Sequence, residues 1–393
     1  MRSVWFAGAA VTLLLASSPP PADRLEAQED PFRQRELTAA PHVKGRLQML
    51  RTQITTRKYT FQVGYTRAMD YRLEQLAGLV PPPNLRDRIQ EKRRAMRTIA
   101  AAPPVAVAGC SAAASSFDWR QNNGSTPVRD QDGCGSCWAF ATHGAFEGSY
   151  ALRNNFFVDS SEQDTLDCNS AGYGCGGGWW AHDELISRGA ARESAYPYTA
   201  SKGTCRTAVP RRYRAEAWDY VSDAETPTEA EMKQALCDHG PLAIAVNVTD
   251  AFVGYTGGVF DACAQRWQAS ASYVPGDLVH SASGYLFECT KAGTSGTSEP
   301  SWPPPPNNPS DVIDNTVVWS YRGYINHGVT LIGWDDGKQA WLIKNSWGTG
   351  WGETGGHGSE RGYMWIKRSC NNVGVGASWV RAKQCTGSKC ECN

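Results

Sequence analysis

The chain has 393 residues, including 13 cysteines and 15 tryptophans, with equal numbers of acidic and basic residues. This length allows two or three compact units, and no internal stretch is apolar for long enough to span a bilayer as a helix. The charge is uneven, because residues 1–99 hold 17 Lys and Arg against 9 Asp and Glu, and the remainder holds 22 against 30. The acidic remainder argues against a nucleic-acid partner and suits docking of the basic N-terminal segment.

The N-terminus has the pattern of a secretory signal peptide, which we assign to residues 1–18. Arg2 precedes an apolar run from Val4 to Ala16, and serines and prolines follow. The run is too short to favour a membrane anchor. We therefore expect a secreted protein (extracellular or periplasmic), with disulfides and with no membrane contact once the signal is removed.

Residues 19–112 are predicted to form a pro-segment rather than a domain. The stretch 86–94 is highly charged and compatible with a helix, and the run 61–65 alternates like a strand that could lie in a binding cleft. The linker 100–108 is rich in Ala and Pro and is loose enough to be cut.

The body, residues 113–382, places predicted helices before predicted strands. After Cys137, apolar side chains recur at helical spacing, which predicts a helix with a buried face. The sequence from Thr226 to Glu229 predicts a capped helix with Pro227 at its first position, running to about Cys237. Strands are expected at 242–248, 329–334, 340–344 and 363–367. This order predicts an α+β fold.

Residues 265–323 differ in composition and are predicted to be a small all-β module inserted into the body. The sequence resembles small chitin-binding-type carbohydrate modules, in which exposed aromatic side chains stack on sugars. The candidates for this role are Trp267, Tyr273, Trp302 and Trp319. An equally good interpretation is that these aromatics form the module's own core. Residues 383–393 form a Cys-rich tail, which we expect to be tied by disulfides rather than to bind a metal.

The segment Gln131–Phe140, with the sequence QDGCGSCWAF, carries the strongest functional signal. It places Cys137 at the expected start of a helix, where partial positive charge favours a thiolate. A Cys-x-x-Cys alone could equally be a redox or metal motif. Here His327, in Asn-His-Gly, and Asn345, in Lys-Asn-Ser-Trp-Gly, follow in order. The combination resembles the papain-like cysteine proteases.

This resemblance implies a two-lobed fold, with a helical lobe and an antiparallel β-barrel-like lobe on either side of a cleft. It implies that Cys137 is the nucleophile, activated by His327. Asn345 would orient the imidazole, and Trp347 would shield their hydrogen bond from water. Gln131 would donate its side-chain amide, with the Cys137 backbone N–H, to the oxyanion.

The resemblance also implies a substrate-binding wall at Gly176 and Gly177 and a specificity pocket with its floor near Val375. Glycines at such a wall let a substrate backbone pair with the main chain. The cysteine pairs that the family implies are Cys134 with Cys175, Cys168 with Cys205, and Cys263 with Cys370. Cys137 would then stay free.

The number of residues between Cys137 and His327 tests the assignment of His327 as the catalytic histidine. It follows Cys137 by 190 residues, whereas the family places this His about 130–150 residues after the nucleophile. Removing the 59 residues of the predicted insertion 265–323 leaves 131, inside that window. The six other histidines lack a comparable flanking pattern, so we expect them to be surface or core residues.

The sequence therefore predicts a secreted bacterial-type cysteine endopeptidase, made as a zymogen and acting through a thioester acyl-enzyme. Its expected partners are protein or peptide substrates and its own pro-segment as inhibitor, with chitin or another polysaccharide as a candidate ligand of the insertion. No cofactor or metal is expected. One alternative is an exopeptidase whose insertion occludes the cleft. The other is a non-catalytic carbohydrate-binding or adhesion protein, which the presence of all four catalytic candidates disfavours.

Overall fold

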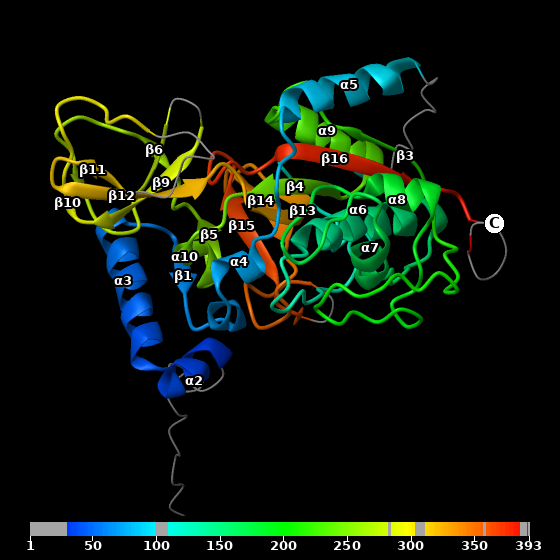
Figure 1. Ribbon diagram of the computed structural model, residues 1–393, viewed down its shortest axis with the longest axis horizontal. Helices are drawn as coiled ribbons and strands as arrows, with labels where there is room; N and C mark the ends of the chain where they lie inside the picture. The colour runs from blue at the N-terminus through cyan, green and yellow to red at the C-terminus, as the bar shows by residue number, and fades with distance from the viewer. Residues whose placement is uncertain are drawn as a thin grey trace, which may run out of the picture.

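A computed structural model describes residues 30–98, 109–281, 284–302, 311–356, 359–385 and 391. The predicted signal peptide and the linker 100–108 lie outside these residues. No helix in the described ranges is both long and apolar enough to cross a membrane. Figure 1 shows a helical lobe beside a long twisted sheet, with the predicted insertion at the opposite end of the molecule.

Residues 30–98, which we call the leader, fold into five helices and a strand that pack on the body. They are α2 (Pro31–Thr38), α3 (Pro41–Arg57), β1 (Phe61–Val63), the 3-10 helix η1 (Arg67–Asp70), α4 (Leu73–Leu76) and α5 (Leu85–Thr98). The helix predicted at 86–94 is confirmed as part of α5. Leader side chains including Leu47, Leu50 and Phe61 are buried in the same apolar cluster as the sheet.

The strand predicted at 61–65 forms as β1, but its predicted place in a cleft is wrong. β1 pairs antiparallel with β5 (Tyr255–Phe260) at the edge of the main sheet. The reason is its alternation, which turns Phe61 and Val63 into the core and leaves Gln62 exposed. A later part of the leader takes the position between the lobes.

The helical lobe is built around α6 (Cys137–Asn154), with α7 (Glu162–Cys168) and α8 (His182–Ser187) beside it. The helix predicted after Cys137 is confirmed. Its burial is wider than one face, because every residue from Cys137 to Ala151 is buried. Strands β13 (His327–Asp335) and β16 (Val375–Ala382) pack on α6, and α7 also contacts it.

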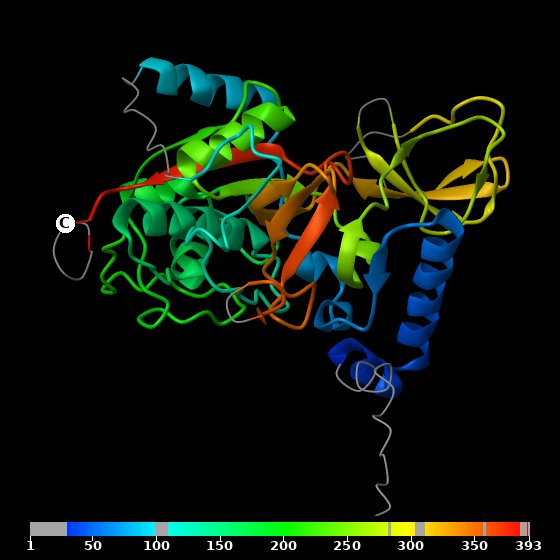
Figure 2. The ribbon, with the colours of Figure 1, turned by 180° about the vertical axis from the view of Figure 1, so that it is seen from behind.

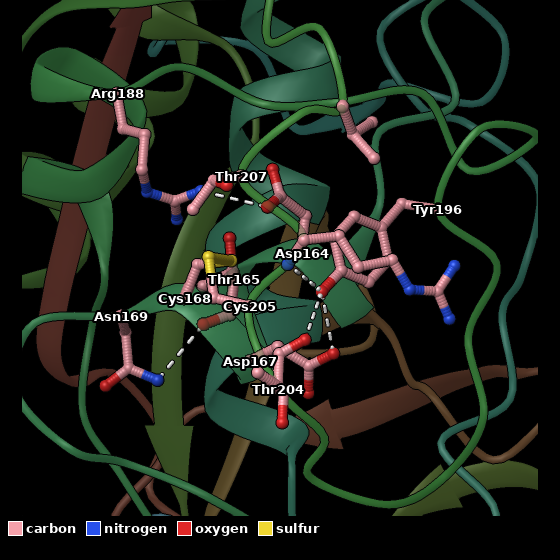
Figure 3. The surroundings of a disulfide bond; sticks show 12 residues. Asp164, Thr165, Asp167, Cys168, Asn169, Arg188, Tyr196, Thr204, Cys205 and Thr207 are labelled. Atoms are coloured by element: carbon pink, nitrogen blue, oxygen red, sulfur yellow. Dashed lines mark hydrogen bonds and ion pairs between the residues drawn. A yellow bond between two sulfur atoms is a disulfide. The ribbon is translucent and has the colours of Figure 1, made fainter.

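A disulfide closes the helical lobe at the end of α7. Figure 3 shows Cys168 bonded to Cys205, with the Tyr196 hydroxyl donating to Asp167 at 2.9 Å. Nearby, the fully buried carboxylate of Asp164 accepts from Arg188 at 2.9 Å. The loop that follows α7 is therefore fixed by covalent and ionic contacts rather than by regular structure.

The second lobe is a nine-stranded sheet in the order β1-β5-β15-β14-β13-β4-β16-β3, with β2 paired to β13. Its remaining strands are β2 (Ser116–Asp118), β3 (Ala215–Tyr220), β4 (Leu242–Val246), β13 (His327–Asp335), β14 (Ala340–Lys344), β15 (Tyr363–Lys367) and β16 (Val375–Ala382). The four strands predicted from the sequence are confirmed, with boundaries shifted by up to two residues. The two-lobed α+β fold expected from the sequence is confirmed.

Helices α9 (Glu229–His239) and α10 (Asp250–Val253) complete this lobe. The predicted start of α9 needs a correction of two residues. Thr228 is the N-cap and exchanges hydrogen bonds with Glu231, so Pro227 precedes the cap and is not the first helical residue. Thr226 and Thr228 each have a Glu three residues later, but the capping box that forms is the one between Thr228 and Glu231.

The predicted insertion, residues 265–323, is called the module below. It contains β6 (Gln265–Arg266), β7 (Ser272–Tyr273), β8 (Leu278–His280), β9 (Leu286–Lys291), β10 (Gly293–Thr294), β11 (Val312–Asp314) and β12 (Val317–Gly323). Five strands form a sheet in the order β11-β12-β9-β8-β6, and β10 pairs with β7. The module has an apolar cluster of its own.

Three of the four aromatic candidates for sugar stacking lie in that cluster. Trp267, Tyr273 and Trp319 are buried, and Trp302 is partly buried against them. The carboxylate of Asp314 accepts from both indoles, at 2.8 Å from Trp267 and 3.1 Å from Trp319. Their burial favours the interpretation that these aromatics are the core of a small domain.

Candidate active site

The candidate nucleophile Cys137 is the first residue of α6, and its thiol is free. The loop before it is held by the disulfide between Cys134 and Cys175. Within that loop the Gly135 N–H donates to the Cys175 carbonyl at 3.1 Å. The thiol therefore stands at a helix N-terminus, on a loop fixed to the segment that contains Gly176 and Gly177.

The sheet lobe supplies the His and Asn. His327 begins β13 and Asn345 directly follows β14, and these neighbouring strands bring His327 Nε2 to 2.7 Å from Asn345 Oδ1. An amide oxygen only accepts, so Nε2 carries the proton, which leaves Nδ1 of the neutral ring as the basic nitrogen. The Trp347 ring lies 4.8 Å from the imidazole, and all three side chains are buried. Water is thereby kept from the hydrogen bond.

The two lobes meet at Gly328. Its backbone N–H points at the Cys137 sulfur. A Cβ at this position would lie 3.2 Å from the Cys137 carbonyl oxygen and 3.1 Å from the Trp180 ring, so any larger residue would push these neighbours apart by a few tenths of an ångström. The structure thus brings the start of α6 and the start of β13 into contact.

The side-chain amide of Gln131 lies at the same site and donates a hydrogen bond to a carbonyl group of the leader. Its Nε2 donates to the Leu76 carbonyl at 3.0 Å and to the Cys134 carbonyl at 2.8 Å. Its Oε1 accepts from the Ser346 hydroxyl at 2.8 Å, which fixes the orientation of the amide. The side chain is completely buried. An amide held in this way is suited to bind a substrate carbonyl oxygen.

The leader segment Leu76–Val80 passes between the lobes over this site. The Gly78 carbonyl accepts from Gly178 N–H and the Val80 N–H donates to the Gly178 carbonyl, both at 2.9 Å. On the other side, Leu79 N–H donates to the Asn326 carbonyl at 2.8 Å. The segment therefore binds backbone groups of both lobes, in parallel register with Gly178.

Burial sets the ionisation of the pair in the leader-covered site. It raises the pKa of the Cys137 thiol to about 11, although N–H groups including those of Gly328 and Gly78 partly offset this. Burial also lowers the pKa of His327 to about 4, partly offset by Asn345 and the Leu76 carbonyl. Near neutral pH the covered site therefore holds a neutral thiol and a neutral imidazole.

The other predicted substrate-binding residues lie close to the leader segment or in the apolar cluster beside it. A Cβ on Gly177, which has φ +133°, would lie 2.6 Å from the Val80 side chain. A Cβ on Gly176 would meet no other atom within 4 Å. Val375 begins β16 and is buried in the cluster that contains Leu79 and Trp180.

Sequence reasoning missed the main-chain groups that contact the leader. Gly178, rather than Gly176 or Gly177, makes the paired hydrogen bonds, and Asn326 contributes its carbonyl. Both stand inside motifs that the sequence showed, since Gly178 follows Cys175-Gly-Gly and Asn326 precedes His327. These motifs were visible in the sequence, but they did not indicate which backbone N–H and carbonyl groups would point into the site.

The cysteine pairs that the family resemblance implies are all present in the structure. It joins Cys134 to Cys175, Cys168 to Cys205 and Cys263 to Cys370, and also joins Cys110 to Cys237, which had no assigned partner. Cys137 and Cys289 are free thiols, and Cys385 is disulfide-bonded. Cys390 and Cys392 lie outside the described residues. Within the described ranges, no cluster of three or more His, Cys, Asp and Glu side chains could hold a metal ion.

Comparisons with known proteins agree with this geometry. The model of the papain family cysteine proteases matches residues 113–274 and 310–382. Fruit bromelain from Ananas comosus is 31% identical over 252 residues, covering 62% of this chain and 54% of that protein. A viral cathepsin from Heliothis zea nuclear polyhedrosis virus is 29% identical over 264 residues, covering 66% of this chain and 54% of that protein. The chain thus spans about half the length of these curated relatives.

Among solved structures, digestive procathepsin L2 from Tenebrio molitor larval midgut superposes with a TM-score of 0.56. It is 23% identical, with 93% of this chain and 95% of that chain covered, so the shared fold includes the leader. The two lobes, the Cys137 helix and the His327–Asn345 pair define a papain-like architecture. Because the family model matches more than half of its residues, the chain belongs to the papain family of cysteine proteases.

Proposed function

We propose that this protein is the zymogen of a cysteine endopeptidase, with Cys137 as the nucleophile. The observation that carries the proposal is the amide of Gln131, which donates to the Leu76 carbonyl of a peptide segment lying over Cys137. A substrate carbonyl bound at that donor would have the thiol of Cys137 close by. The His327–Asn345 pair then supplies a base of defined tautomer.

In the proposed reaction, His327 Nδ1 takes the thiol proton and the sulfur attacks the scissile carbonyl carbon. The oxygen gains negative charge and receives hydrogen bonds from the Gln131 amide and the Cys137 N–H. Collapse breaks the C–N bond, and the imidazolium gives its proton to the leaving amine, which leaves a thioester. Water, deprotonated by His327, then attacks the thioester and releases the acid and the thiol.

The leader fits the role of a built-in inhibitor. It occupies the Gln131 donor and the backbone groups of Gly178 and Asn326, which a substrate would need. Among the described residues, eight ion pairs join the leader to the body or the module, and in each the cation lies on the leader. This agrees with the opposite net charges of the two parts of the sequence. Cleavage in the linker 100–108 is the proposed start of activation.

Endopeptidase rather than exopeptidase activity is supported by the way the leader crosses the site. A continuous chain enters from α4 and leaves toward α5, so the space between the lobes admits a peptide that extends beyond both ends. Leu79 is buried in the apolar cluster that includes Trp180, Ile325 and Val375. We therefore propose that the enzyme prefers substrates with a leucine-sized aliphatic side chain at the subsite beside Val375.

Export from the cytosol is supported by the apolar N-terminal run and by the four disulfides between described cysteines.

A polysaccharide ligand for the module has less support. Of the four aromatic candidates only Trp302 is not buried, and its indole N–H is bound to Glu299 at 2.7 Å. The function of the module is addressed separately below.

The central test compares the two free thiols in the described structure. Cys137→Ala should lower peptide hydrolysis by the activated protein at least about a thousandfold, because the covalent step is lost. Cys289→Ala is the matched control, since Cys289 is also buried but lies in the module. It should leave turnover unchanged. Substantial hydrolysis by Cys137→Ala, or equal losses in both variants, would refute the proposal.

A further inference from the structure

The module contacts the leader as well as the body. Helix α3 ends at Arg57, whose Nε donates to Asp277 Oδ1 at 2.8 Å while Nη2 pairs with Oδ2. Arg57 Nη2 also reaches the Ser272 carbonyl at 3.4 Å. In both ribbon views the C-terminal end of α3 meets the module (Figures 1 and 2). Two segments separated by 220 residues in the sequence thus form a bidentate ion pair.

Asp277 is held in place by the module's own backbone. The turn from Val274 has Pro275 at its second position and Gly276, with φ +91°, at its third, and Asp277 N–H donates to the Val274 carbonyl at 3.0 Å. This is a type II turn. The carboxylate in turn accepts from Val274 N–H at 2.8 Å and is 8% exposed. A fixed carboxylate with so little contact with water gains much from a bidentate guanidinium.

The shape of the turn also matches α3. Gln53 lies one helical turn before Arg57 and therefore on the same face of the helix. Its side chain is buried over Gly276, where a Cβ would lie 2.6 Å from Gln53 Oε1. The glycine that the turn requires thus also leaves room for the Gln53 amide. The turn therefore complements α3 in charge, through Asp277 and Arg57, and in shape, through Gly276 and Gln53.

We propose that Ser272, Gly276 and Asp277 form a docking surface for α3, and that the module serves to hold the leader on the enzyme. This rests on the proposed zymogen function. The position of the module supports it, because β5, which pairs with β1 of the leader, leads through Cys263 directly into the module. The module therefore extends the leader-binding edge of the body and controls how readily the leader is released.

The first experiment measures hydrogen exchange of the α3 amides in the full chain carrying Cys137→Ala, which prevents self-cleavage. Arg57→Gln and Asp277→Asn should each speed exchange about tenfold, since each removes charged hydrogen bonds. The double variant should be no faster than the faster single variant, because both remove the same contact. Arg46→Gln is the matched control, with a guanidinium of equal exposure on the same helix that pairs with Asp250 of the body.

Arg46→Gln should speed exchange by the same factor with or without Asp277→Asn. Unchanged exchange in both Arg57→Gln and Asp277→Asn, or fully additive effects of the two, would overturn the proposal. This measurement needs no catalytic activity, so it decides the docking role even if the proposed peptidase function fails.

The second experiment uses the full chain with Cys137 intact. Arg57→Gln and Asp277→Asn should shorten the time to leader removal about tenfold, the factor expected for exchange. Once the leader is gone, Asp277→Asn should hydrolyse a short peptide at the unmodified rate. Unchanged activation kinetics would refute a role in leader retention, whereas lost hydrolysis after activation would place the module in the catalytic machinery instead.

Discussion

Gly78 is the point at which the covered site is most sensitive to one added methyl group. A Cβ there would lie 2.6 Å from Gly135 Cα and still closer to the Gly135 carbonyl group. Those atoms are backbone, in a loop fixed by the disulfide between Cys134 and Cys175, so they cannot move aside. Gly78→Ala should therefore push the leader segment away from the site.

The magnitude follows from the hydrogen bonds that this segment makes. Four hydrogen bonds join it to the body. Gln131 donates to the Leu76 carbonyl, Leu79 donates to the Asn326 carbonyl, and Gly178 exchanges one bond each with Gly78 and Val80. Each contributes about 1 kcal/mol net. Losing two to four of them costs about 2–4 kcal/mol, which raises the uncovered population by a factor of about 30 to 1,000. Helix α5 and the leader's ion pairs remain, so the leader should stay attached elsewhere.

The assay is alkylation of Cys137 by a thiol-reactive epoxide in the uncleaved full chain, followed by mass spectrometry of the intact protein. Gly45→Ala is the matched control, because it adds the same methyl group to α3, where nothing lies within 4 Å. It should leave alkylation unchanged and favour the helix by about 0.5–1 kcal/mol. If Gly78→Ala were alkylated as slowly as Gly45→Ala, the segment would not be what blocks the thiol.

Two further predictions concern conditions rather than residues. Because burial lowers the pKa of His327 from 6.5 to about 4, the stability that the neutral imidazole gives the covered form is present above pH 6.5 and is lost as pH falls toward 4. Leader release, followed by gel analysis, should therefore speed up on acidification, and acid-insensitive release would contradict this. Since the ion pairs between the leader and the rest of the chain are largely solvent-accessible, added salt should also speed release. Salt-independent release would show that apolar contacts around β1 dominate.

The catalytic candidates could be predicted from the sequence because each stands in a short local motif. Cys137 follows a Gly-rich loop, and His327 and Asn345 follow in an order that few unrelated chains would share. The helix and the strands that carry them also have clear periodicity. The extent of burial of α6 was not predictable, because its pattern reports one apolar face and not how many elements surround the helix.

The segment Leu76–Val80, which we propose blocks the site, was not predictable in the same way. The sequence pointed to 61–65, whose alternation is strong, whereas Leu76–Val80 has no periodicity and acts through backbone groups. Side-chain patterns do not reveal which carbonyl or N–H groups will be used. The contact between Arg57 and Asp277 was equally hidden, because 220 residues separate two ordinary charged side chains.

These contacts together determine where activation is controlled. The His327–Asn345 hydrogen bond, the fixed Gln131 amide and the disulfide beside Cys137 are all formed while the leader is bound. Since Gln131, His327 and Asn345 already have these partners, the free energy of leader binding is the barrier to activation in the proposed zymogen. Part of that energy comes from the segment Leu76–Val80 over the site, and the rest comes from β1, α5 and the end of α3, which lie away from it. Because the module contacts the leader at the end of α3, we propose that it sets the rate of activation without taking part in the catalytic step.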